Sequence, residues 1–182
     1  MPDEDRIEAR AEELFVWRSA TAQASPAALR LPFHELYRYL TDPAANLGMD
    51  QQRLLFSDQR LRSDFQRLKR DLSARPGYGE LPRAAAAADD RGLDERRFDG
   101  GRVRIVRSER NERQIYVIFE FEDPAKSFAA LILEAQNGDL AKLRLGSGDE
   151  TGLVQVLLDT GNDEHDRLVR MVRDPQTVGM FI

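Results

Sequence analysis

The spacing of apolar side chains changes once along this chain. Up to about Leu72 they recur every three or four residues, which is typical of amphipathic helices. Beyond Arg102 they recur every second residue, which is typical of strands buried on one side. The pattern therefore predicts an α+β protein, in which a helical N-terminal part is followed by a small antiparallel β-sandwich or barrel domain.

Two amphipathic helices are predicted near the start of the chain. The first covers residues 3–20 and has a broad apolar side that includes Phe15 and Trp17. The second begins at Pro32, where the missing N–H of proline costs nothing in a first turn. Its apolar face has the helical spacing i, i+3, i+4, i+7 and consists of Phe33, Leu36, Tyr37 and Leu40.

A longer apolar stripe closes the helical part. Its members are separated by 7, 4, 3 and 4 positions, and they are Leu54, Leu61, Phe65, Leu68 and Leu72. The other positions are mostly charged and include Arg60 and Arg67. Ser57 and Asp58 are both suitable N-caps inside the stretch, so one bent helix and two shorter helices both remain open.

Residues 73–95 are interpreted as a flexible linker between a helical region, 1–72, and an antiparallel β domain, 96–182. The linker segment has few large apolar residues, and a structureless loop of that length is unusual inside one compact domain. Alternating patterns with turn signals between them predict strands around 103–105, 115–121, 128–133, 140–145, 154–158 and 177–182. A short helix capped by Asn162 or Asp163 is predicted between the last two.

The amino-acid composition indicates where in the cell the protein is expected. Of the 182 residues, 41% are apolar and 32% charged, which suits a soluble globular protein. No apolar run approaches the ~20 residues that span a bilayer, and the acidic start of the chain lacks the features of a signal peptide. Cysteine is absent, so disulfides and thiolate zinc sites are excluded. We therefore expect a cytoplasmic protein without membrane contact.

Arginine is concentrated in the first predicted hairpin. Residues 96–113 hold seven arginines and three acids, a local charge of +4. These arginines would either bind phosphate or form the solvent-facing row of a sheet, because alternation turns Arg102 and Arg104 away from Val103 and Ile105. We favour the second interpretation, since acidic neighbouring strands could neutralise the row and the whole chain carries −5.

Common catalytic motifs are missing from the sequence. The two histidines, His34 and His165, have no partner at a spacing that suggests nucleophilic or acid–base catalysis. The acidic stretch 159–166 lacks the order of a calcium loop and is interpreted as a turn followed by a helix cap. No phosphate-binding glycine loop is present. We therefore predict no catalytic residues, no metal site and no cofactor.

The sequence is best interpreted as a non-enzymatic adaptor-like or regulatory protein that binds another protein. Helix 3–20 is the preferred docking element, because it is wide in apolar residues and lies at a terminus, and aromatic residues are the expected anchors because they carry most interface energy when buried. The candidate partner-binding residues are Phe15, Trp17, Phe33, Tyr37, Arg60 and Arg67. One alternative is a nucleic-acid-associated regulator that uses the basic segments 53–70 or 96–113. The other is an enzyme with an unrecognised carboxylate-based site.

Overall fold

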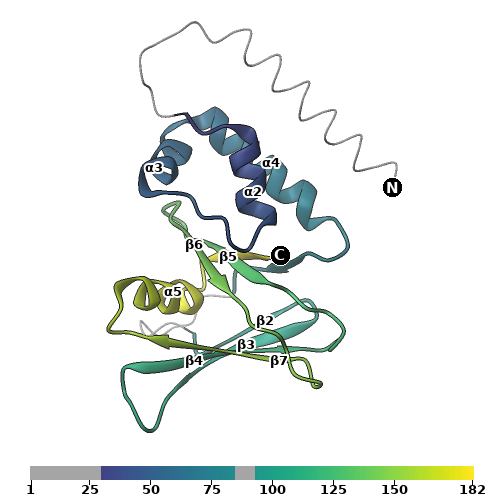
Figure 1. Cartoon of the computed structure of the whole chain (residues 1–182), viewed down its shortest axis with the longest axis vertical. Coiled ribbons are helices and arrows are strands. Elements are labelled where there is room, and N and C mark those ends of the chain that lie inside the picture. The colour runs from purple at the N-terminus through teal and green to yellow at the C-terminus, as the bar shows by residue number, and fades with distance from the viewer. Residues whose placement is uncertain (1–29, 85–92) are drawn as a thin grey trace, which may run out of the picture.

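The computed structural model describes residues 30–84 and 93–182, and these form three layers (Figure 1). A helical layer covers one four-stranded antiparallel sheet, and a second four-stranded antiparallel sheet packs beneath the first. The predicted α+β class with an antiparallel sandwich is therefore confirmed. The predicted helix 3–20, with Phe15 and Trp17, lies outside the described residues.

The helical layer consists of α2 (Phe33–Thr41), α3 (Met49–Ser57) and α4 (Gln59–Ser73). Asp58 separates the last two, so the apolar stripe from Leu54 to Leu72 belongs to two helices and not to one bent helix. Its carboxylate accepts hydrogen bonds from the backbone N–H groups of Arg60, at 2.8 Å, and Leu61, at 3.1 Å. These bonds satisfy N–H groups that have no partner within the helix, so a new helix begins directly after Asp58.

The chain crosses between two sheets, with β1, β5, β6 and β8 in sheet A and β2, β3, β4 and β7 in sheet B. Sheet A has the order β1 (Gly79–Leu81), β8 (Val178–Phe181), β5 (Ala130–Glu134) and β6 (Leu140–Arg144). Sheet B has the order β2 (Glu95–Phe98), β3 (Gly101–Arg107), β4 (Gln114–Phe121) and β7 (Leu153–Asp159). Helix α5 (Asp163–Arg173) follows β7 and is capped by the side chain of Asn162, as predicted.

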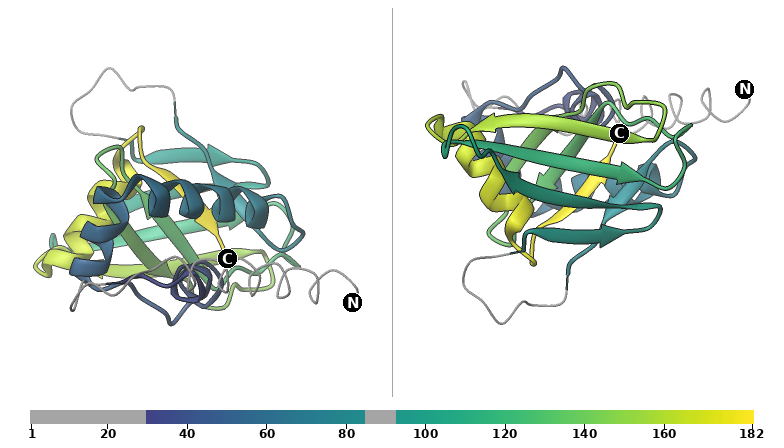
Figure 2. Two further views of the ribbon diagram at one scale, coloured as in Figure 1. Left: turned by 90° about the horizontal axis from the view of Figure 1, so that it is seen from above. Right: turned by 90° about the horizontal axis from the view of Figure 1, so that it is seen from below.

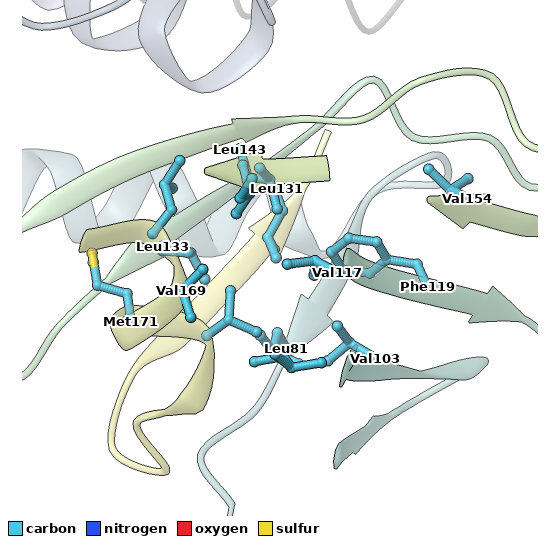
Figure 3. Close-up of a cluster of buried hydrophobic side chains, with 14 of the residues drawn as sticks. Leu81, Val103, Val117, Phe119, Leu131, Leu133, Leu143, Val154, Val169 and Met171 are labelled. Atoms are coloured by element: carbon cyan, nitrogen blue, oxygen red, sulfur yellow. The ribbon is translucent and has the colours of Figure 1, made fainter. Parts of the chain in front are cut away.

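One hydrophobic core lies between the two sheets (Figure 3). Leu131 and Leu133 of β5 point toward sheet B, where Val103 and Val117 meet them. Helix α5 closes one end of this core with a buried apolar side that consists of Leu168, Val169, Met171 and Val172. The period-2 pattern of the sequence is therefore explained by strands that each turn one side into the sandwich.

A second core lies between sheet A and the helical layer. Sheet A also has side chains on the face opposite to the sandwich core. Those of Ile132, Leu140 and Met180 pack with the buried residues of α2–α4. Every residue of β5 is buried for this reason. A strand covered on both faces has a continuous apolar run instead of an alternating one, which accounts for the run that ends at Leu133. The helices and sheet A consequently share a core.

Three residues of the segment expected to be a linker belong to sheet A. Gly79–Leu81 form the edge strand β1, which pairs with β8 in the register Gly79↔Phe181. The expectation of a linker over all of 73–95 is therefore wrong at these positions, and β2 begins at Glu95. The sequence could not predict this strand, because three residues are too few to show an alternating pattern and the pairing joins segments about 100 positions apart.

Candidate functional site

The outer face of sheet B is the side that points away from sheet A. Alternation places Arg102, Arg104 and Val106 of β3 on this side, because Val103 and Ile105 fill the sandwich core. Figure 2, in its right panel, looks directly at the four strands, and no described element lies over them. Within residues 30–84 and 93–182, this face of sheet B therefore has no covering layer.

An apolar row crosses the middle of this face. The strand registers pair Val106 with Tyr116 and Tyr116 with Leu157, so one side chain from each of β3, β4 and β7 stands in line. Val106 is 40% exposed and Leu157 47% exposed, while Tyr116 and its neighbour Ile118 are half-buried. The solvent side of an antiparallel sheet is usually polar, and adjoining exposed apolar residues indicate an interaction surface.

An arginine–glutamate cluster lies beside the apolar row. The carboxylate of Glu120 accepts hydrogen bonds from Arg102 and Arg104, with N–O distances of 2.6 to 2.7 Å. The hydrogen bond from Arg102 is the largest cause that lowers the pKa of Glu120 below its usual value. These arginines form an outer row neutralised by a neighbouring strand, as expected from the sequence.

Charge divides the outer face into two halves. The β2–β3 half carries Glu95, Arg97, Arg102 and Arg104, whereas Tyr116, Ile118 and Leu157 stand on β4 and β7. Over all four strands, Arg97, Arg102 and Arg104 are balanced by Glu95, Glu120 and Asp159, so positive charge is confined to the β2–β3 half. Its chemistry therefore fits a partner that has apolar side chains along an acidic edge.

The residues singled out from the sequence lie elsewhere. Phe33 is half-buried against the helical core, and Tyr37, one turn further along α2, is 38% exposed. Arg60 and Arg67 are exposed on α4 and are two turns apart. Sheet A separates all four from the outer face of sheet B (Figure 1). Phe15 and Trp17 belong to the part of the chain that the structure does not describe.

The sequence contains a weak signal for the apolar residues on the outer face of sheet B. Val106, Tyr116, Ile118 and Leu157 occupy the positions that alternation assigns to solvent, yet each is apolar. Each one alone is unremarkable, because single apolar side chains are common on protein surfaces. Only the strand registers place them together, and the registers could not be obtained from a single sequence.

Lys142 is a charged side chain with a structural task. Its Nζ donates to the carbonyl oxygens of Tyr39, Asp42 and Ala45 at 2.6 to 2.8 Å and lies 4.3 Å from the centre of the Tyr39 ring. Burial lowers its pKa to about 8. A lowered pKa can mark a nucleophilic lysine, but here all three N–H groups are engaged with backbone oxygens at the end of α2.

Arg96 has a comparable role in sheet B. It pairs in register with Val103 and therefore points into the protein, where it is 3% exposed. Its two terminal nitrogens donate to four carbonyl oxygens, those of Pro82, Val172, Asp174 and Thr177, at 2.6 to 3.2 Å. The guanidinium thus joins the edge strand β2 to the segments before and after it, which is a structural role.

A cleft of about 430 Å³ opens between the end of α4 and the edges of the two sheets. Its apolar part is lined by Phe98, Phe121, Phe128 and Phe181. Its acids, Glu80 and Asp99, are both exposed. A general acid or base is normally tuned by burial or by a close charge, so these carboxylates give the enzyme alternative little support.

Across residues 30–84 and 93–182, no cluster of three or more histidine, aspartate or glutamate side chains could hold a metal ion. None of the helices in these ranges is long and apolar enough to cross a bilayer. The stretch 159–166 is a turn and helix cap, as expected, with Asn162 accepting from the N–H groups of Glu164 and His165.

Comparison with known proteins returned no relative. No family model matches the chain, and neither a curated protein nor a solved structure is similar to it.

Proposed function

We propose that this protein is a non-enzymatic adaptor or regulator that binds another protein, and that the outer face of sheet B is its binding surface. The proposal keeps the cytoplasmic location expected from the sequence. The observation that carries it is the apolar row Val106–Tyr116–Leu157, over which no described element lies. Burying such a row against a partner removes apolar area from water, at about 25 cal/mol per Å².

The chemistry of the face favours a protein over a nucleic acid. A phosphate-binding surface needs arginines or lysines that are free to contact phosphate. Arg102 and Arg104 instead share the carboxylate of Glu120, and the apolar row would gain nothing from a phosphate backbone. Positive charge is confined to the β2–β3 half and is balanced over the whole face, which suits an acidic edge on a protein segment rather than a polyanion.

Capture from an extract of the native host tests the surface directly. The full chain is immobilised beside two variants, Leu157→Asp and Met49→Asp. Leu157 stands in the apolar row, whereas Met49, 62% exposed on α3, is an apolar residue of the helical layer and provides the matched control. We expect the main captured protein to be lost with Leu157→Asp and kept with Met49→Asp.

Two results would count against this function. The first is an unchanged set of captured proteins for Leu157→Asp, with its fold verified by circular dichroism. The second is a captured partner that disappears after nuclease treatment, which would favour the nucleic-acid alternative.

A further inference from the structure

We infer that the outer face of sheet B binds residues 3–20 of a second copy of this chain when no other partner occupies it. The inference rests on the proposed function of this surface and adds a specific occupant. Two copies related by a twofold axis could each supply a segment and a face, which is the reciprocal arrangement of a closed dimer.

The sequence of residues 3–20 has the chemistry that the face requires. At helical spacing, its apolar stripe consists of Ile7, Ala11, Leu14, Phe15 and Trp17. Asp5, Glu8 and Glu12 are separated by three and four positions, so a helix would place them together at the edge of this stripe, beyond Phe15. The segment contains six acids and three arginines, a net charge of −3.

The segment and the face are complementary in both apolar area and charge. A helix lying along β4 would set its stripe on the apolar half, which carries Tyr116, Ile118 and Leu157. Its acidic edge would then lie over the β2–β3 half, where Arg97 is 83% exposed beside the two arginines paired with Glu120. Exposed ion pairs contribute less than about 1 kcal/mol each, so apolar burial would provide the affinity and charge would set the orientation.

The geometry assigns the segment to a second copy. The described chain begins at Arg30, just before α2, in the helical layer on the far side of sheet A from sheet B (Figure 1). A helix docked on sheet B would lie about 30 Å from the helical layer, since packed layers are about 10 Å apart. The nine residues 21–29 span at most about 30 Å, and they would also have to pass around two sheets.

Trp17 allows the inference to be tested in the intact chain. It is the only tryptophan of the protein, so its emission reports on residues 3–20 alone. Sedimentation velocity and Trp17 emission with acrylamide quenching are measured over a thousandfold range of protein concentration. We expect dilution to convert a dimer with shielded Trp17 into a monomer with exposed Trp17. Leu157→Asp should weaken the dimer at least tenfold, and the control Met49→Asp should leave it unchanged.

A second variant changes the segment and leaves the face intact. Phe15→Ala removes an apolar anchor while keeping the Trp17 reporter, and we expect it also to weaken the dimer at least tenfold. A monomer at all concentrations would overturn the inference. So would Trp17 shielding that does not depend on concentration, which would mean docking within one chain, or shielding that survives Leu157→Asp, which would mean docking elsewhere.

The two proposals fail in different ways. If Leu157→Asp abolishes capture of the host protein but leaves Trp17 unaffected, the inference about residues 3–20 is wrong and the proposed function stands. If Leu157→Asp changes neither readout, the surface itself is wrong and both are rejected.

Discussion

Lys142 shows how a single strand residue fixes the position of a helix. It lies opposite Ile132 in the register of β5 and β6, so it points from sheet A toward the helical layer. There its ammonium group contacts carbonyl oxygens at the end of α2, where the negative end of the helix dipole favours a cation. The alternating sequence 140–145 predicts Lys142 on the wet side of a strand, because it cannot show that helices cover that side.

The pKa of Lys142 can be measured by itself because the chain has only three lysines, with Lys69 and Lys126. Burial lowers the pKa of Lys142 to about 8. In an NMR titration of protein that carries ¹³C-labelled lysine, we expect one ¹³Cε signal to titrate near that value and to vanish in Lys142→Met. Three signals that all titrate near the ordinary value of 10.5 would show that the ammonium is not desolvated.

The same shift sets a direction for stability against pH. Between about 8 and 10.5 the unfolded chain keeps a proton on Lys142 that the folded chain has released. The contribution of this group to stability therefore rises with pH through that interval and is smallest below it. Urea unfolding should show the wild type gaining stability relative to Lys142→Met from pH 8 to 10.5. A constant difference would contradict the shift.

At the scale of elements, Glu134 attaches helix α4 to sheet A through polar contacts beside the core that the helices share with this sheet. Glu134, the last residue of β5, accepts from Gln66 at 2.6 Å and from Lys69 at 2.7 Å. The side chains of Lys69 and Glu134 are 13% and 11% exposed. A buried pair adds little net stability compared with apolar residues, but one partner left alone is costly because its charge remains desolvated.

A double-mutant cycle tests this attachment. We expect Glu134→Leu alone to lower the free energy of unfolding by about 3 kcal/mol, since Lys69 would lose its carboxylate. Adding Lys69→Leu should recover most of that loss and bring the double variant within about 1 kcal/mol of wild type. Urea denaturation measures all four proteins. Additive losses in the double variant would show that the two side chains do not interact energetically.

The sequence predicts long elements well and short ones poorly. Asp58 could be identified as a cap because its chemistry is local, and the stripe that ends at Leu72 predicts a helix over several turns. The strands β1 and β2 have three and four residues and leave no periodic signal. One of the two inward positions of β2 is Arg96, so the apolar pattern is interrupted as well as short. Only the carbonyl groups around Arg96, from distant segments, explain its burial.

The candidate interaction surface depends on the assembled sheet. The alternation of residues 115–121 identifies the core side of β4 but does not identify its neighbours. Val106 and Leu157 are 51 positions apart, and they share a row only because both flank Tyr116. For the same reason the site residues that the sequence predicts lie on helices, where spacing along one element is sufficient to define a face.

At the scale of the whole molecule, the shared core argues against two independent units. The change in apolar spacing predicts a helical region and a β domain that bury their cores separately. Sheet A instead contributes to both cores, with Leu133 in the sandwich core and Ile132 in the helical one. Loss of either core would remove packing from β5, which lies between them. We therefore expect residues 30–182 to unfold in a single transition.

Neighbouring residues on β5 provide a matched pair for this last prediction. Ile132→Ala opens a cavity toward the helices and Leu133→Ala opens one toward sheet B, and each should cost about 3 kcal/mol. Hydrogen exchange of the slowest amides then reports on α4 and on β3–β4 separately. In a cooperative molecule, both variants lower protection equally in both layers. If Ile132→Ala affects only α4 and Leu133→Ala affects only the strands, the helices and the sandwich are separate folding units.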